Sequence, residues 1–196
     1  MKYLGTAADV TARRERYARV ERERRFLLRE LPPGLELAHP HTQIFDNYVT
    51  ETRLRLRKVR VPERREWTWK LTQKFAPDPE DLSRTLITNI YLSQYEYELL
   101  SVFEGNEIRK NRYPYEHEGR RYSVDVFLGV LHGLLLAETE FETDDEMRAF
   151  HPPAFAALEV TDDELFTGAR LVGLTAERAR DELARRLAPR PPAEAS

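Results

Sequence analysis

The sequence contains two acidic pairs whose members are separated by a single residue. Glu21 and Glu23 form the first pair, and Glu138 and Glu140 form the second. In a strand, residues i and i+2 lie about 7 Å apart on the same face, so each pair would present two carboxylates side by side. Two carboxylates about 4 Å apart repel by ~4 kcal/mol at an effective dielectric constant of 20, and a divalent cation relieves that repulsion. Hard oxygen ligands without cysteine favour Mg²⁺ or Mn²⁺.

Basic side chains repeat with the same spacing. They occur in three stretches, as Arg53, Arg55 and Arg57, as Lys70 and Lys74 beside Thr68 and Thr72, and as Lys110 and Arg112. Arginine donates paired hydrogen bonds to phosphate oxygens, and each charge-assisted bond is worth ~1.5–3 kcal/mol. A polyphosphate bridged to the glutamates by a metal ion would satisfy both sets of charges. The spacing therefore predicts a site for a many-oxygen anion and its cation.

The sequence is compatible with two orientations of the charged strand faces. In the simpler one they are the solvated outer faces of ordinary strands. In the other, the opposite apolar faces pack against flanking helices, which turns the charges into the interior of a barrel and makes the lumen a ligand site. The residues expected on the apolar faces are Phe26, Leu54, Leu56, Leu71, Ile108, Ala137, Thr139 and Phe141.

Short strands must position these residues. Alternation with period 2 and aromatic or β-branched residues predict strands within residues 20–28, 46–49, 52–59, 66–75, 85–92, 107–115, 121–127, 134–142 and 157–160. A closed antiparallel barrel is the simplest arrangement that leaves no exposed edge. The expected fold class is α+β and mainly β, a closed eight-stranded antiparallel barrel with flanking helices.

Helices are expected around this barrel. Ser93 and Glu96 form a capping box that begins one helix, and Thr143 with Glu146 begins a second, short one. The apolar residues of the first helix are expected to form one buried stripe, made of Leu99, Leu100, Val102 and Phe103. A C-terminal helix is marked by Leu174, Ala179, Leu183 and Leu187.

Length and composition limit the class of protein. The 196 residues suggest one folded domain over residues 19–188, with an N-terminal extension over 1–18 and a disordered tail over 189–196. Lys and Arg number 31 and Asp and Glu 34, so the net charge of −3 argues against a simple nucleic-acid binder. The lack of cysteine excludes disulfides, thiolate metal sites and a cysteine nucleophile. No apolar run approaches the ~20 residues of a membrane span, so we expect a cytoplasmic protein with no membrane partner.

Other catalytic motifs are absent from the sequence. Ser123 lacks a nucleophile-elbow motif, and there is no P-loop or dinucleotide-binding glycine motif. The histidines show no metal-ligand spacing apart from His39 and His41, which lie in a proline-bounded loop. The basic run over residues 53–65 alternates with period 2, which fits a strand better than an RNA-binding tail. A homodimer is left open.

Taken in order, the charged motifs resemble those of the CYTH superfamily, the triphosphate tunnel metalloenzymes. Glu21-Arg22-Glu23-Arg24-Arg25 resembles the family's first-strand motif E-x-E-x-K. Three basic strands follow: Leu54-Arg55-Leu56-Arg57 resembles R-x-R, Thr68-Trp69-Lys70 resembles T-x-K, and Lys110-Asn111-Arg112 resembles K-x-R. Val124-Asp125-Val126-Phe127 with Gly129 then resembles D-x-F-x-G, Gly133-Leu134 resembles GL, and Ala137-Glu138-Thr139-Glu140-Phe141 resembles AE-x-E. The last match is Glu159-Val160-Thr161 to E-V-T. The resemblance covers about residues 20–172.

The resemblance implies an eight-stranded tunnel in which a divalent metal supports hydrolysis of inorganic triphosphate or a small organic triphosphate. It assigns the metal, Mg²⁺ or Mn²⁺, to Glu21, Glu23, Glu138 and Glu140, the phosphate chain to Arg25, Arg55, Arg57, Lys70, Lys110 and Arg112, and catalysis to Glu21, Glu23, Arg25, Lys70, Glu138 and Glu140. Asp125 is a weaker candidate that would orient a basic residue.

Two departures from the family pattern affect this expectation. Arg25 stands where the family usually has Lys, and arginine cannot give up or accept a proton. The stretch 87–91 carries no carboxylate where many members have an acidic pair. Two alternatives therefore stay open, a non-catalytic sensor that binds polyphosphate or nucleotide, and an adenylate cyclase.

Overall fold

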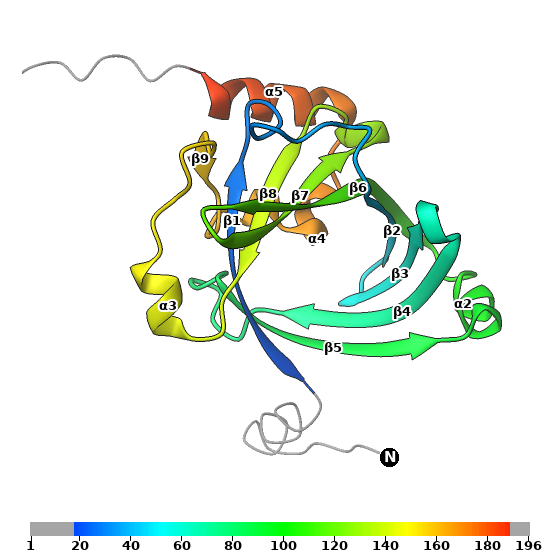
Figure 1. Cartoon of the computed structure of the whole chain (residues 1–196). Coiled ribbons are helices and arrows are strands. Elements are labelled where there is room, and N and C mark those ends of the chain that lie inside the picture. Colours follow the sequence, from blue (N-terminus) through cyan, green and yellow to red (C-terminus); the bar gives the residue numbers. More distant parts are fainter. Residues whose placement is uncertain (1–17, 189–196) are drawn as a thin grey trace, which may run out of the picture.

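The computed structural model describes residues 18–188, and one antiparallel sheet dominates it (Figure 1). The sheet has nine strands in the order β5-β4-β3-β2-β6-β7-β8-β1-β9, and an additional β5–β1 pairing closes eight of them into a barrel. The expected closed eight-stranded antiparallel barrel is confirmed. The strands are β1 (Arg19–Leu27), β2 (Thr42–Val49), β3 (Leu54–Val61), β4 (Glu66–Phe75), β5 (Arg84–Leu92), β6 (Gly105–His117), β7 (Arg120–Phe127), β8 (Leu135–Glu140) and β9 (Leu158–Glu159).

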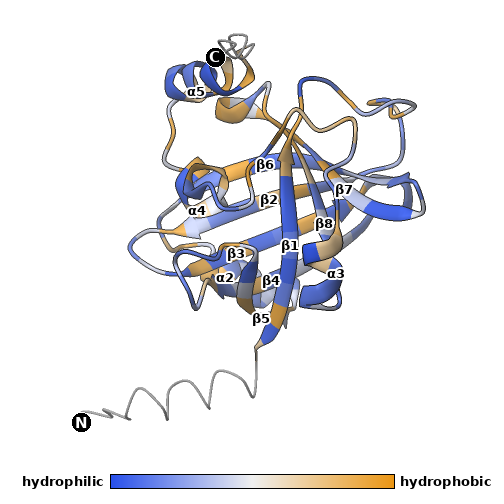
Figure 2. Cartoon of the chain, turned by 90° about the vertical axis from the view of Figure 1, so that its left-hand side faces the viewer, coloured by the Kyte–Doolittle hydropathy of each residue, from blue (hydrophilic) through white to orange (hydrophobic). Residues whose placement is uncertain are grey.

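The first strand closes the barrel because it pairs with both β5 and β8. Its first half pairs with β5, with Glu21 opposite Thr85. Its second half pairs with β8, with Glu23 opposite Glu140 and Arg25 opposite Glu138. Most of β1 is hydrophilic in Figure 2, which is unusual for a central strand. This placement brings the two acidic pairs onto adjacent strands.

The interior of the barrel changes from charged to apolar along the strands. On β1 the charged residues Glu21, Glu23 and Arg25 are followed at the same parity by Leu27, which is fully buried. Leu27 belongs to an apolar cluster with Ile108, Phe127, Leu131, Leu134, Leu136, Val160, Phe166, Leu171 and Ala179. The expectation that Ile108 lies on the outer apolar face is wrong, because it shares the parity of Lys110 and Arg112 and lines the cavity with them.

Four short helices lie within residues 18–188, and the last two of them cover the apolar end of the barrel interior. The helices are α2 (Gln94–Leu100), α3 (Asp144–Ala149), α4 (Gly168–Leu171) and α5 (Ala176–Leu187), with 3₁₀ turns η1 (Pro62–Arg64), η2 (Gly129–Leu131) and η3 (Glu164–Phe166). α4 is seen through the ring of strands in Figure 1, and α5 packs Ala179, Leu183 and Leu187 on the interior cluster. Within residues 18–188, no helix is long and apolar enough to cross a membrane.

A second apolar cluster lies on the outer face of β1, β6, β7 and β8. It contains Phe26, Leu28, Leu35, Tyr113, Tyr122, Val124 and Ala137. The cover comes largely from loops, since Leu31 precedes β2 and Phe150 and Phe155 follow α3. The charged faces of the same strands can therefore point into the barrel.

The helix α2 corrects one expectation. Its capping box is present, because Ser93 accepts a hydrogen bond from the Glu96 amide and Glu96 accepts one from the Ser93 amide. The buried stripe is wrong: Leu99 is 55% exposed and Val102 is 77% exposed, and α2 has no buried residue. The helix ends at Leu100, so Val102 and Phe103 lie beyond it and cannot continue its face. The expected tail over 189–196, and all but one residue of the expected 1–18 extension, lie outside the described residues.

Candidate active site in the barrel cavity

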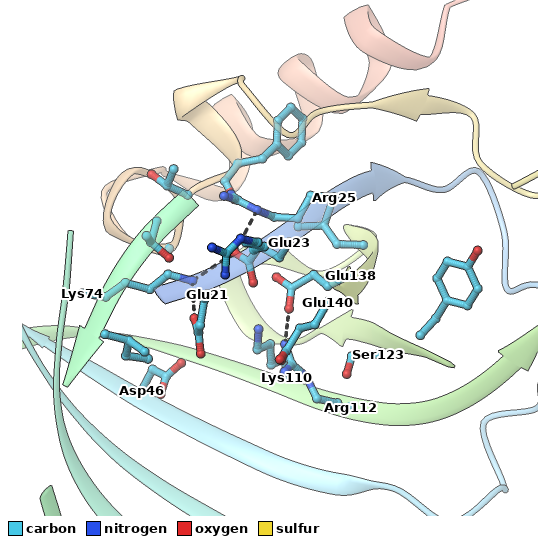
Figure 3. A pocket seen from close by; sticks show the side chains of 18 of the residues that line it. Glu21, Glu23, Arg25, Asp46, Lys74, Lys110, Arg112, Ser123, Glu138 and Glu140 are labelled. Atoms are coloured by element: carbon cyan, nitrogen blue, oxygen red, sulfur yellow. Dashed lines mark hydrogen bonds and ion pairs between the residues drawn. The ribbon is translucent and has the colours of Figure 1, made fainter. Parts of the chain in front are cut away.

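All eight barrel strands contribute side chains to a cavity of about 1840 Å³. Glu21, Glu23, Lys74, Lys110, Arg112 and Glu138 gather around it in Figure 3. Nine of the ten residues expected at the site line the cavity, namely Glu21, Glu23, Arg25, Arg55, Arg57, Lys110, Arg112, Glu138 and Glu140. Lys70 is the tenth and does not.

The first acidic pair is held by a lysine on another strand. Lys74 Nζ lies 3.0 Å from Glu21 Oε2 and 3.0 Å from Glu23 Oε1. Burial alone would raise the pKa of Glu21, but the Lys74 ammonium lowers it below its ordinary value. The same two glutamates outweigh the burial of Lys74 and raise the pKa of its ammonium. The charged forms of Glu21 and Lys74 therefore stabilise each other.

The second acidic pair is divided between two environments. Glu138 accepts a hydrogen bond from Arg112 Nη2 at 2.5 Å. Burial would raise the pKa of Glu138, but Arg112, Lys110 and other cations lower it well below its ordinary value. Glu140 is 66% exposed at the end of β8, and partial burial together with Glu21 and Glu23 raises its pKa. Glu140 therefore takes up a proton more readily than Glu21 or Glu138.

A buried aspartate orients the arginines of β3. Asp46 on β2 is 1% exposed and accepts hydrogen bonds from Arg57 Nε at 2.5 Å and Arg57 Nη2 at 2.7 Å. Arg55 Nε lies 3.7 Å from the same carboxylate. Burial alone would raise the pKa of Asp46, but Arg57 and Arg55 lower it far below its ordinary value. Sequence reasoning missed Asp46, whose one signal is an isolated acid between Ile44 and Tyr48 at cavity-facing parity.

Asp125 makes equivalent contacts on β7, which is separated from β2 only by β6. It is fully buried on β7 and accepts hydrogen bonds from Lys110 Nζ at 2.5 Å and from Arg112 Nε at 2.7 Å. Burial lowers the pKa of the Lys110 ammonium despite this carboxylate. Asp125 thus fixes the direction in which the two cations of β6 point.

The lysine of β4 that faces the cavity is not the expected one. Lys70 Nζ lies 5.0 Å from the centroid of the Tyr91 ring, and Lys70 does not line the cavity. Lys74 lines the cavity instead. The T-x-K pattern occurs twice on this strand, at Thr68 to Lys70 and at Thr72 to Lys74, so sequence alone could not choose between them.

Comparisons with known proteins agree with this geometry. No protein-family model matches the chain. The chain is 31% identical over 148 residues to the inorganic triphosphatase of Nitrosomonas europaea, a match that spans 74% of this chain and 92% of that protein. The chain belongs to the CYTH superfamily of triphosphate tunnel proteins.

Two further similarities support the same family. The inorganic triphosphatase of Acetivibrio thermocellus is 38% identical over 95 residues, which cover 43% of this chain and 59% of that protein. The crystal structure of the inorganic triphosphatase NE1496 superposes with a TM-score of 0.53 and 28% identity, over 78% of this chain and 93% of that chain.

Arg25, where this CYTH protein departs from the usual lysine, contacts backbone as well as the cavity. Its Nη1 donates to the Phe166 carbonyl at 3.0 Å and its Nη2 to the Leu82 carbonyl at 3.5 Å, while Nε lies 3.4 Å from Glu23. The guanidinium therefore ties η3 and the loop before β5 to β1. A lysine has one terminal nitrogen and could not reach both carbonyls in this way.

The other departure lies on β5, between the lysine strand and the first acidic pair. The residues that this strand gives to the cavity are Thr85 and Ile87. Thr85 Oγ1 is buried and has no hydrogen-bond partner among the described residues. One wall of the CYTH tunnel thus carries no charge here.

The residues expected to hold a metal ion have suitable donor chemistry. All four are carboxylates, which suit hard divalent cations. Within residues 18–188, however, no three His, Asp or Glu side chains converge as a ready metal site. A positive charge already stands between Glu21 and Glu23, since Lys74 pairs with both. The location is suited to a cation, and a divalent ion there would take the place of the ammonium.

Proposed function

We propose that this protein hydrolyses triphosphates inside its barrel, acting on inorganic triphosphate or a small organic triphosphate with Mg²⁺ or Mn²⁺. The observation that carries the proposal is the single cavity that joins the arginines of β3 and the cations of β6 to the glutamates of β1 and β8. Two relatives that the chain resembles are named inorganic triphosphatases. A linear triphosphate has the charge and the number of oxygens that these walls can bind.

The residues of the chain supply mainly positioning and electrostatic stabilisation. Arg55, Arg57 and Arg112 would bind phosphate oxygens, and Asp46 and Asp125 hold these guanidinium groups in place before the substrate arrives. Phosphoryl transfer passes through a loose transition state whose charge is spread over the oxygens, so donors fixed in advance lower its barrier. A divalent ion held by Glu21, Glu23, Glu138 and Glu140 would add charge neutralisation.

A phosphate-release assay tests the proposal. The wild type should release phosphate from tripolyphosphate with Mg²⁺ or Mn²⁺, and Glu138→Gln should lower the rate by about 10²-fold or more, as loss of a preorganised charged group does. Glu107→Gln is the matched control, because Glu107 pairs with Arg109 outside the cavity lining. Equal, negligible release by the wild type and Glu138→Gln would reject the enzymatic function.

Binding without turnover is the second candidate, and one observation favours it. The Arg25 guanidinium is engaged by the Phe166 and Leu82 carbonyls, so it has less freedom to follow a phosphate through a reaction. In that case, calorimetry should show tight binding of tripolyphosphate while no phosphate is released. The absence of any binding heat would exclude the sensor.

A further inference from the structure

Lys74 takes the position that a metal ion would be expected to occupy. Its ammonium is 3.0 Å from both Glu21 Oε2 and Glu23 Oε1, and these glutamate side chains are only 11% and 9% exposed. Figure 3 shows the lysine directed at the pair from the neighbouring wall. Two nearly buried carboxylates need such a counter-charge, because without one they would repel each other.

The sheet order explains why Lys74 reaches these carboxylates. β4 lies between β3 and β5, and β5 lies between β4 and β1. The cavity-facing residues of β5 are the uncharged Thr85 and Ile87, so Lys74 extends past them to the glutamates of β1. On its other side is β3, where Arg55 is opposite Thr72 of β4. Lys74 therefore stands between the phosphate-binding wall and the metal-binding wall.

The cation that pairs with Glu138 is fixed more firmly than Lys74. Arg112 contacts Glu138, but it also donates two hydrogen bonds to the buried Asp125, at 2.7 and 2.6 Å. Arg112 thus keeps a partner if Glu138 turns away. Lysine is a point charge on a flexible four-carbon chain, and Lys74 can exchange its two carboxylates for phosphate oxygens without breaking a fork of this kind.

We propose that Lys74 is the resident counter-ion of the Glu21–Glu23 pair, and that its transfer to phosphate oxygens makes divalent-cation binding depend on the bound anion. This inference rests on the proposed function and adds to it an order of binding. In the empty cavity, a divalent cation must displace Lys74 from the carboxylates. With triphosphate bound, the ammonium has new partners and no longer competes with a metal ion for Glu21 and Glu23, whose other cation contacts are Arg19 at 2.9 Å and Arg25 at 3.4 Å. By linkage, the cation strengthens anion binding by the same factor.

Binding of Mn²⁺ alone gives the decisive measurement. Lys74→Met should bind Mn²⁺ at least tenfold more tightly than the wild type when followed by calorimetry or by the spin resonance of free Mn²⁺. Lys58→Met is the matched control, because it removes the same charge from a lysine whose Nζ lies 5.1 Å from the Phe45 ring and which does not line the cavity. Its Mn²⁺ affinity should equal that of the wild type. Equal affinity of Lys74→Met and Lys58→Met would overturn the proposal.

The anion arm uses tripolyphosphate in the presence of EDTA. Lys74→Met should bind tripolyphosphate at least tenfold more weakly than Lys58→Met. If it binds equally well, Lys74 does not move to the anion and the proposal fails. Neither arm requires turnover. If Lys74→Met shows both effects and the wild type nevertheless releases no phosphate, the proposed hydrolysis is rejected and this inference stands.

A second variant and a wild-type measurement cover the case in which Lys74→Met does not fold. Lys74→Gln keeps a polar group near the carboxylates and should show the same gain in Mn²⁺ affinity. On the wild type, sulfate chelates Mn²⁺ only weakly, and saturating sulfate should raise the Mn²⁺ affinity severalfold. An unchanged or lowered Mn²⁺ affinity with sulfate would contradict the coupling.

Discussion

Buried aspartates hold cations of the cavity wall at fixed positions. Asp46 and Asp125 are 1% and 0% exposed, and each contacts two cations that line the cavity. Removing one partner of such a buried ion pair leaves an uncompensated charge, which costs about 3–5 kcal/mol. The cations would also regain rotational freedom before a substrate arrives. Stability and substrate affinity should therefore respond together when an anchor is removed.

Asp46→Asn should lower the free energy of unfolding by roughly 3–5 kcal/mol at pH 7, because Arg57 and Arg55 lose their counter-charge in a buried place. Urea denaturation followed by circular dichroism measures this change. Asp145→Asn makes the same chemical substitution at a carboxylate that is 90% exposed and should leave the stability nearly unchanged. Similar stability of the two variants would show that the ion pairs of Asp46 with Arg57 and Arg55 do not stabilise the fold.

The contribution of Asp46 to the free energy of unfolding should decrease as the pH falls. Arg57 and Arg55 lower the pKa of folded Asp46 below its ordinary value of 3.8, so the unfolded chain binds this proton more readily than the folded one. The stabilisation is therefore complete above about pH 5 and is lost as the pH falls below 3.8 towards the folded value. The stability difference between wild type and Asp46→Asn should stay constant from pH 6 to 8 and shrink below pH 4. A difference that grows on acidification would contradict the assignment.

The spacing of charges made much of the cavity wall predictable from the sequence. Period 2 fixes which residues share a face, so the acidic pairs and the arginines of β3 could be identified together. Spacing cannot say how far along the barrel a residue lies, and Lys70 and Lys74 share one face at different depths. It also cannot reveal Asp46, because a single acid in a strand shows no repeat.

At the scale of elements, the turn into α4 depends on a glycine. A Cβ on Gly168 would lie 1.8 Å from Tyr48 Oη, which is far inside van der Waals contact. Gly168→Ala should therefore displace the Tyr48 ring or α4 and lower stability by about 1–3 kcal/mol, the usual range for overpacking. Gly173→Ala adds the same methyl where the nearest atom is 3.6 Å away and should change the melting temperature little. Equal melting temperatures would mean that α4 has room to move.

The exposed apolar residues in and after α2 should contribute little to the stability of the fold. Leu99→Gln replaces a side chain that is 55% exposed and should change stability by less than about 0.5 kcal/mol. Leu56→Ala removes a side chain that is 1% exposed and should cost about 2–5 kcal/mol. The two melting curves decide the point, and a large loss for Leu99→Gln would indicate that the predicted buried stripe forms in solution.

Local signals predicted where elements begin more reliably than what they bury. The Ser93 capping box located α2, because capping is a contact between residues three positions apart. Whether Leu99 is buried depends on strands far away in sequence, and no local pattern carries that information. Similarly, β2 begins at Thr42, four residues before the predicted strand, because Thr42, Gln43 and Ile44 pair with β6 and β3.

Considered as a whole, the barrel interior has an apolar half that forms a core and a charged half that lines the cavity. Leu134 is 2% exposed in the apolar cluster and does not line the cavity. Leu134→Ala should therefore cost about 2–5 kcal/mol of stability while leaving the tripolyphosphate affinity unchanged. A ligand that binds only the folded state adds about 2.7 kcal/mol at a concentration of 100 Kd. Saturating tripolyphosphate should raise the melting temperatures of wild type and Leu134→Ala by similar amounts. A rise confined to the wild type would show that packing of the apolar cluster and ligand binding in the charged cavity are energetically coupled.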